Sequence, residues 1–265
     1  MKLLQMKKLS AHLGFRVAYD GKFFEGFQSQ THTRSVQQAI ERALKIFFRK
    51  PLRIQFSSRT DTGVHAYDQI ILIPHGYELY EKLVPEQKKR LLYSLNALLN
   101  DQIVLWKILR LSSDFNPKRD LDWKEYEYRI LSGPINDPLW RDRVWWIRSP
   151  LHLPSIKKAL KKIKGRHDFS GFATKRRNLM ETIDNTRTIL DAELRVEKHR
   201  EIDELTWLIL RFRGNGFLYR MVRNLVGALV EVGRGSESRV EEILKSRIRP
   251  QSLMSAPAEG LRLIQ

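Results

Sequence analysis

Residues 57–66 read Ser-Ser-Arg-Thr-Asp-Thr-Gly-Val-His-Ala, a polar stretch between two apolar segments, residues 52–56 and 66–73. The apolar segments are typical of strands, so the sequence predicts a strand, a loop and a strand. Asp61-Thr62-Gly63 alone is typical of a turn, because Asp bonds to its own backbone and Gly accepts positive φ. Strand ends are also where a rigid scaffold presents reactive groups, so Asp61 is either a turn former or a functional acid.

Strands and helices recur on both sides of this loop. Residues 13–19 predict a strand that ends at Asp20-Gly21, and a capping box of Ser35 and Gln38 begins a helix that Pro51 ends. Apolar periodicity predicts helices over 85–99, 153–163, 217–232 and 237–245, and strands over 103–109, 126–131, 144–147, 186–196 and 205–212. The predicted class is α+β, with two α/β halves, 1–133 and 134–265.

The composition excludes several kinds of chemistry. The 265 residues contain no cysteine, which excludes disulfides, a thiol nucleophile and cysteine-ligated metals. The seven histidines never occur at metal-ligand spacing, and no P-loop occurs. Gly214-Asn215-Gly216 lacks the third glycine of a dinucleotide-binding loop, because Tyr219 stands there. We therefore expect neither a metal nor a nucleotide cofactor.

The charge of the chain is strongly positive. There are 48 Lys plus Arg against 30 Asp plus Glu, which gives a formal net charge of +18. Such an excess favours a polyanionic partner, although solubility alone is an alternative. The apolar runs of the chain are far shorter than the roughly 20 residues of a membrane span, and no signal peptide is recognisable near the N-terminus. We expect a cytoplasmic protein that does not span a membrane. The basic clusters are Lys157-Lys158, Lys161-Lys162, Lys164, Arg166 and Lys175-Arg176-Arg177.

The predicted helix 217–232 has two distinct faces. Apolar residues occupy one of them, and Arg220, Arg223, Asn224 and Gly227 fall on another. The glycine would allow another segment to approach closely. From periodicity alone, Arg223 is either a solvated residue of an amphipathic helix or a functional group.

Arg59-Thr60-Asp61 and Gly63-Val64-His65-Ala66 together resemble the active-site motif of the TruA-type tRNA pseudouridine synthases. Further motifs that resemble this family follow in the family's order along essentially the whole chain. They are Tyr19-Asp20-Gly21, Gly26-Phe27-Gln28, Ser35-Val36-Gln37, Ser94-Leu95-Asn96-Ala97, Asp114-Phe115, Tyr126-x-Tyr128, His167-Asp168-Phe169, Phe217-Leu218-Tyr219-x-Met221-Val222-Arg223-Asn224 and Ala256-Pro257-Ala258-Glu259-Gly260-Leu261. The resemblance implies the pseudouridine synthase fold, in which two α/β halves with mixed, mainly antiparallel sheets flank a basic central cleft.

The resemblance also implies an activity, the isomerisation of uridine to pseudouridine in the anticodon stem-loop of tRNA, at positions 38 to 40. One carboxylate and no cofactor are needed, and the family motif places that role on Asp61. The carboxylate either adds covalently to the ribose or base, or acts as a base at the sugar. Tyr126 matches the aromatic residue that stacks on the target base, and Arg223 the arginine that pairs with the acid. The alternatives are a plain strand tyrosine and a solvated arginine.

Other residues are weaker candidates for RNA contacts. Arg59 matches an arginine that helps to extrude the nucleotide, and a structural salt bridge is its alternative. His65 either contacts RNA or packs the loop. Lys118 lies in Asn116-Pro117-Lys118, which replaces a His-Ala-Arg stretch of the family. Lys175, Arg176 and Arg177 are candidates for tRNA phosphates, or else form a solvated face. The chain also departs from the family at Phe27, Ser58, Asn100 and Arg262, where Trp, Gly, Pro and Tyr are usual.

The expected partners are a tRNA and, as the resemblance implies, a second copy of the chain in a homodimer. Two other functions compete with the isomerase. One is a non-catalytic tRNA-binding or RNA-folding protein of the same fold, against which the presence of Asp61, Tyr126 and Arg223 argues. The other is a glycoside-cleaving enzyme, which would need two carboxylates where the motif supplies one.

Overall fold

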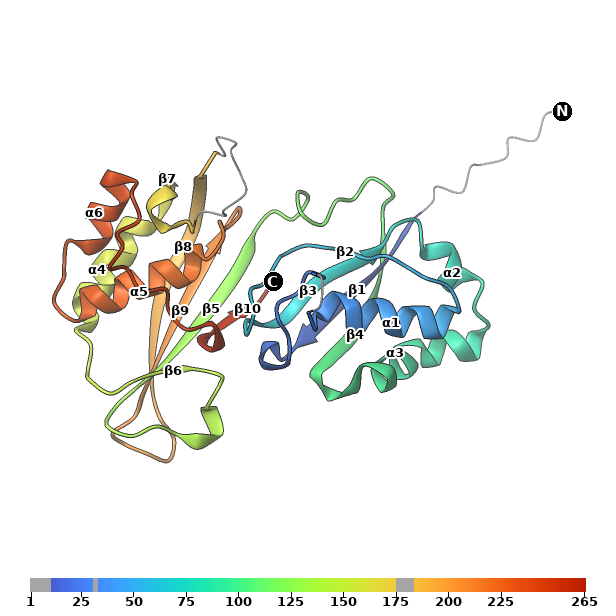
Figure 1. Cartoon of the computed structure of the whole chain (residues 1–265), viewed down its shortest axis with the longest axis horizontal. Coiled ribbons are helices and arrows are strands. Elements are labelled where there is room, and N and C mark those ends of the chain that lie inside the picture. The colour runs from blue at the N-terminus through green and yellow to red at the C-terminus, as the bar shows by residue number, and fades with distance from the viewer. Residues whose placement is uncertain (1–10, 31–32, 175–183) are drawn as a thin grey trace. The chain divides into compact units, whose positions relative to one another are not determined.

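The computed structural model of the chain describes residues 11–30, 33–174 and 184–265. The chain divides into two compact units, of which the first ends at Leu121 and the second begins at Asp122. Each unit combines a mainly antiparallel sheet with helices, so the predicted α+β class is confirmed (Figure 1). Within the described ranges, no helix is long and apolar enough to cross a membrane.

The sheet of the first unit has the strand order β4-β1-β3, with the short β2 paired to β3, and all these pairs are antiparallel. Leu13, Phe15 and Val17 alternate along the central strand β1 and are fully buried. The elements of this unit are β1 (His12–Tyr19), α1 (Val36–Phe48), β2 (Gln55–Phe56), β3 (His65–Ile73), α2 (Tyr77–Glu81), α3 (Pro85–Leu99) and β4 (Ile103–Leu111).

Helix α1 begins at the predicted capping box. The Ser35 hydroxyl accepts the backbone N–H of Gln38 at 3.2 Å, and the Gln38 side chain accepts the N–H of Ser35 at 3.3 Å. The helix ends at Arg49, which adopts a left-handed conformation two residues before Pro51. Its buried positions, which include Ile40 and Leu44, recur at helical spacing and explain why the periodicity predicted it.

The sheet of the second unit has the strand order β10-β5-β9-β8-β7. These neighbours are antiparallel, and the short β6 pairs with β5 in parallel. Helix α4 packs on β8, and α4, α5 and α6 pack on one another, as Figure 1 shows. The elements are β5 (Lys124–Ser132), β6 (Trp145–Ile147), α4 (Leu153–Ile163), β7 (Gly165–Asp168), β8 (Thr186–Lys198), β9 (Thr206–Gly214), α5 (Met221–Gly233), α6 (Arg239–Ser246) and β10 (Leu261–Leu263).

Strand β5 belongs with the second unit. It pairs with β9 along its whole length and with β10 over Tyr126 to Tyr128. The sequence-based division after residue 133 instead grouped this strand with the first half, because strong turn residues follow it at Gly133-Pro134. Pairing partners that lie far away in the sequence leave no signal in the local pattern.

Helix α5 differs from its prediction in two ways. It begins at Met221 rather than at residue 217, because Arg220 has a left-handed backbone with φ of 58°. It is also buried on nearly all sides, and Asn224 is completely inaccessible. A Cβ atom on Gly227 would lie 2.0 Å from the carbonyl oxygen of Met254, so the predicted close approach at this glycine is confirmed. Short elements such as α2, β7 and β10 were not predicted, because three to five residues carry too little periodicity.

Candidate active site

Buried polar side chains of the first unit hold the loop that carries Asp61 in place through hydrogen bonds. Gln69, fully buried on β3, donates from its side-chain amide to the carbonyl oxygen of Ser58 at 2.7 Å. The Tyr19 hydroxyl donates to the Gln69 side-chain oxygen at 2.9 Å and lies 2.7 Å from the hydroxyl of Thr60. This network fixes the two residues that flank Arg59, and with them the entry into the turn at Asp61.

The turn itself follows the predicted Asp-x-Gly pattern. The backbone N–H of Val64 donates to the carbonyl of Asp61 at 3.1 Å, and Gly63 has a φ of 78°, which favours glycine. A second glycine, Gly21, lets the preceding segment approach, since a Cβ there would lie 2.1 Å from the Val64 carbonyl oxygen. Asp61 therefore lies in a tightly packed turn, and it is partly exposed.

The other predicted residues of the first unit surround this loop. The side chain of Arg59 is exposed and makes no salt bridge with any described residue, so the structural pairing considered for it does not occur within that part of the chain. Lys118 is also exposed, and its ammonium lies 5.6 Å from the ring centre of Phe56, the residue just before the loop. Two exposed cations thus lie on or beside the loop of Asp61.

His65 packs the loop. Its Nδ1 atom accepts the backbone N–H of Gly21 at 3.1 Å and lies 3.0 Å from a carboxylate oxygen of Asp20. The imidazole is 11% exposed. These contacts give the packing role that the sequence left open, while an RNA contact of His65 stays a prediction.

Tyr126 lies in the second unit, on β5. It is 8% exposed, and its ring meets that of Phe217 edge to face, with centroids 5.0 Å apart. Two residues further along the same face, Tyr128 donates its hydroxyl proton to the carbonyl of Pro257 at 2.8 Å. Burial raises the pKa of Tyr128 well above its usual value, Glu259 raises it further, and the positive charge of Arg223 opposes both.

Arg223 is oriented by the residue that precedes Pro257. Its Nε atom donates to the carbonyl of Ala256 at 2.7 Å, and the backbone N–H of Ala256 donates to the carbonyl of Arg223 at 3.0 Å. Arg223 therefore contacts Ala256, and Tyr128, on the same face of β5 as Tyr126, contacts the next residue, Pro257. Lys175, Arg176 and Arg177 lie outside the described residues. Within the described part of the chain, no group of three or more His, Cys, Asp or Glu side chains could hold a metal ion.

Comparison with known proteins decides the family. A family model described as tRNA pseudouridine synthase matches residues 159–265. A tRNA pseudouridine synthase A 1 of Bacillus cereus is 38% identical over 252 residues, which cover 94% of this chain and 95% of that protein. The chain belongs to the tRNA pseudouridine synthase family. The tRNA pseudouridine synthases A of Halalkalibacterium halodurans and Lactococcus lactis are 37% and 35% identical, over 94% and 93% of this chain and 89% and 93% of theirs. The resemblance seen in the motifs is confirmed.

In this member of the tRNA pseudouridine synthase family, sequence reasoning missed two supporting residues. Gln69 interrupts the apolar run 66–73, and a polar residue in a buried strand is the signal that could have found it. The sequence placed Asn224 on a polar helix face and in a family motif, without a role of its own. Its side-chain amide donates to the carbonyl of Phe172 at 2.7 Å, and its oxygen accepts from the hydroxyl of Ser255. Asn224 thus joins three segments next to Arg223.

Replacing Asn224 with aspartate should disturb this junction. The variant presents an oxygen to the Phe172 carbonyl in place of the amide donor, and a buried unsatisfied group costs about 1–3 kcal/mol. We expect the free energy of unfolding to fall by about 2 kcal/mol, and turnover of tRNA to fall roughly tenfold because Arg223 shifts. Urea denaturation and steady-state kinetics measure the two effects. Ser255→Ala removes one hydrogen bond of the same junction and should cost about 1 kcal/mol; an Asn224→Asp variant as stable as the parent would contradict the assigned role.

Proposed function

We propose that the protein converts uridine to pseudouridine at positions 38 to 40 of the anticodon stem-loop of tRNA, with Asp61 as the catalytic carboxylate. Its family makes the protein an isomerase of tRNA. The observation that carries the proposal for Asp61 is its turn, which buried groups hold in place while the residue stays partly exposed. A preorganised acid on a rigid strand end is what a reaction at one carboxylate requires.

The reaction is a balanced rearrangement within one nucleotide. The bond from N1 of the base to C1′ of the ribose breaks, the base rotates, and C5 forms a new bond to C1′. The proton on C5 leaves to solvent, and N1 gains a proton. Neither an oxidant nor an energy donor enters, so the acid and the residues that hold the flipped nucleotide are sufficient.

The remaining predicted residues receive roles that suit their surroundings. Tyr126, whose ring Phe217 supports edge-on, stacks on the extruded base. Arg223, whose Nε atom donates to the carbonyl of Ala256, pairs with the acid. Arg59, exposed two residues before Asp61, contacts the RNA as the nucleotide leaves the stack. Weaker RNA contacts are proposed for His65, Lys118, Lys175, Arg176 and Arg177.

We further propose that the protein acts as a homodimer in the cytoplasm, where tRNA is modified. This part rests on the family resemblance, and the mass of the protein in solution tests it. A species of twice the 31.3 kDa chain mass is expected.

Tritium release tests the proposed activity directly. An anticodon stem-loop transcript labelled with tritium at uridine C5 should lose tritium to solvent when incubated with the protein and no cofactor. No release from several tRNAs and stem-loops would contradict the proposal. Binding of tRNA without release would favour the non-catalytic RNA-binding alternative, and free uracil in place of pseudouridine would favour glycoside cleavage.

A further inference from the structure

Helix α4 displays four lysines that its packing forces outward. Lys157, Lys158, Lys161 and Lys162 are all exposed, whereas Ile156, Ala159, Leu160 and Ile163 are buried beneath them. Because residues four apart lie on the same side of a helix, the lysines form two rows, Lys157 with Lys161 and Lys158 with Lys162. Within each row the charges are about 6 Å apart along the helix axis.

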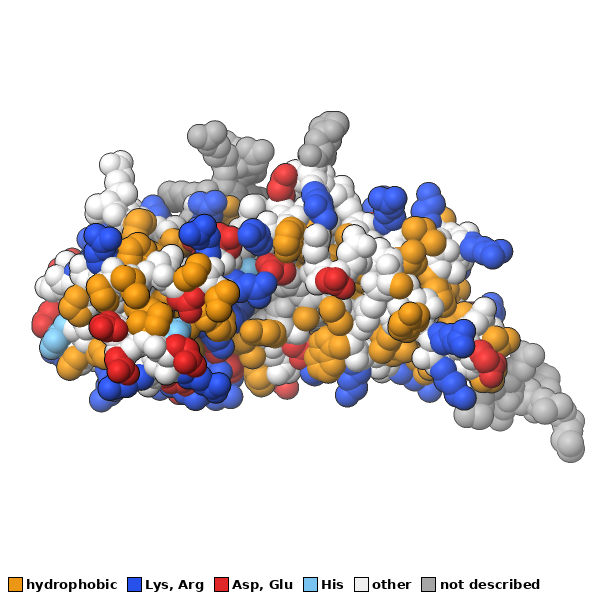
Figure 2. Space-filling view, turned by 90° about the horizontal axis from the view of Figure 1, so that it is seen from below, with side chains coloured by type: hydrophobic (Ala, Val, Ile, Leu, Met, Phe, Trp, Pro, Cys, Tyr) orange, Lys and Arg blue, Asp and Glu red, His pale blue; other side chains and the backbone are white. Residues whose placement is uncertain are grey.

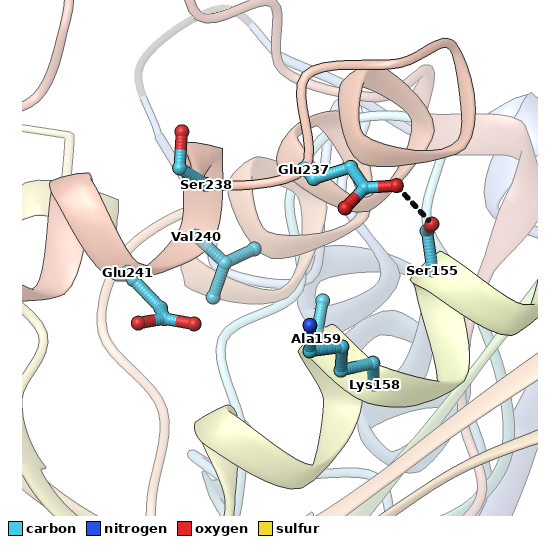
Figure 3. Close-up of a pocket in the computed structure, with 7 residues that line it drawn as sticks. All are labelled: Ser155, Lys158, Ala159, Glu237, Ser238, Val240 and Glu241. Carbon is cyan, nitrogen blue, oxygen red and sulfur yellow. Dashed lines mark hydrogen bonds between the residues drawn. The ribbon is translucent and has the colours of Figure 1, made fainter.

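The row of Lys158 and Lys162 faces acidic side chains of the neighbouring segment. The Lys162 ammonium lies 3.6 Å from a carboxylate oxygen of Glu241 on α6. Lys158 lines a cavity of about 220 Å³ between α4 and α6, together with Glu237 and Glu241. Figure 3 shows both carboxylates at this pocket, where the hydroxyl of Ser155 on α4 donates a hydrogen bond to Glu237. The positive charge of this row is therefore balanced locally.

The row of Lys157 and Lys161 has no such balance. Both lysines are exposed, and neither forms an ion pair with a described residue. The cations that follow the helix have acidic neighbours, since the charge of Arg166, on β7, lowers the pKa of Asp184. Lys164 pairs with Asp191 at 2.6 Å. Figure 2 shows one face of the protein, on which lysines and arginines lie among acidic side chains. A row of uncompensated charge on a rigid helix is a distinct feature of the second unit.

We propose that Lys157 and Lys161, the α4 row, bind the phosphate backbone of tRNA outside the anticodon stem-loop; this inference rests on the proposed function. Lysines on a convex helix bind phosphates as point charges and read no base sequence, which suits a duplex backbone. The row is also set apart from the residue that stacks on the target base. Helix α4 packs on β8, and β9 separates β8 from Tyr126 on β5.

Salt titration of binding tests the α4 row against a matched control on the same helix. The test variant is Lys157→Gln/Lys161→Gln, and the control is Lys158→Gln/Lys162→Gln, with the same change in net charge. For full-length tRNA, the plot of log K against log salt should be less steep for the test variant, by about 1.4–1.8 in slope. The affinity of the test variant at low salt should be roughly tenfold lower, or more. The control should change affinity by less than about threefold. Binding of the isolated anticodon stem-loop, and tritium release from it, should match the parent in both variants.

Three results would overturn the proposal. Equal weakening by the two variants would assign the effect to net charge, and an unchanged affinity of the test variant for full-length tRNA would remove the row from the interface. Loss of binding to vesicles of anionic lipid, with tRNA binding intact, would assign the row to a membrane surface. Because the comparison measures binding alone, it stays informative if tritium release fails, and failure of the row leaves the proposed isomerase untouched.

Discussion

Replacing Asp61 with asparagine is expected to lower the turnover of tRNA by roughly 10⁴-fold, a loss of about 5.5 kcal/mol of transition-state stabilisation. The amide has the same shape as the carboxylate but neither its charge nor its basicity. The affinity for tRNA should stay within about threefold of the parent, because the proposed RNA contacts of Arg59, Tyr126 and Arg223 remain.

The fold should tolerate this change. The contacts that hold the loop use the backbone of Ser58 and the hydroxyl of Thr60, and the turn uses the backbone carbonyl of Asp61; the variant keeps all three groups. A loss of turnover can therefore be assigned to the side-chain chemistry. Single-turnover tritium release measures the rate, and filter binding measures the affinity.

A matched variant, Asp101→Asn, removes one exposed carboxylate of the same unit and should leave both quantities unchanged. An Asp61→Asn protein that keeps more than about a tenth of the parental rate would show that another group supplies the acid. A variant that loses affinity and turnover together would instead place Asp61 in RNA binding.

Local patterns predicted much of this fold. The capping box at Ser35 fixed the start of α1, alternation found most strands, and the polar stretch 57–66 marked the loop of Asp61. Each of these signals lies within about a dozen residues of sequence. The start of α5 was predicted wrongly because the apolar pattern extends through Leu218, whereas the left-handed Arg220 interrupts the helix.

The supports of the site were not predictable in the same way. Gln69 reaches Ser58 across a strand pair, and Asn224 reaches Phe172 from 52 residues away. Such contacts depend on register and packing, which no local period encodes. Resemblance to the family motifs singled out Asp61, Tyr126 and Arg223 as candidate site residues. The contacts around these residues are visible only in the structure.

Glu127 is the clearest case of a residue that only register explains. It lies on β5, opposite Arg211 of β9 and Arg262 of β10, and is 1% exposed. Its carboxylate accepts from Arg129 at 2.7 Å and from Arg211 at 2.9 Å, and Arg262 lies 4.0 Å away. One buried carboxylate thus balances three guanidinium groups, including the arginine that replaces the family's usual tyrosine.

Replacing Glu127 with alanine is expected to lower the free energy of unfolding by about 3–5 kcal/mol, because it removes the one buried carboxylate that these three guanidinium groups share. Urea denaturation at neutral pH measures the change. The matched control is Glu193→Ala, which removes an exposed carboxylate opposite the same Arg211 and should cost less than about 1 kcal/mol. Equal losses in the two variants would show that Glu127 contributes no more than a surface ion pair.

The stability supplied by Glu127 should also depend on pH, with a definite sign. Burial, the largest influence, would raise the pKa of Glu127, but the hydrogen bonds and charges of Arg129, Arg211 and Arg262 together hold it below the usual 4.5. A carboxyl whose pKa is lower in the folded state stabilises the fold above its unfolded pKa, and this contribution disappears as pH falls through the folded value. The difference in unfolding free energy between the parent and Glu127→Gln should therefore be constant from pH 7 down to about 5 and shrink below about 4.5. If this difference in unfolding free energy instead grew as the pH fell, the folded protein would favour the protonated, neutral form of Glu127, which would contradict the prediction.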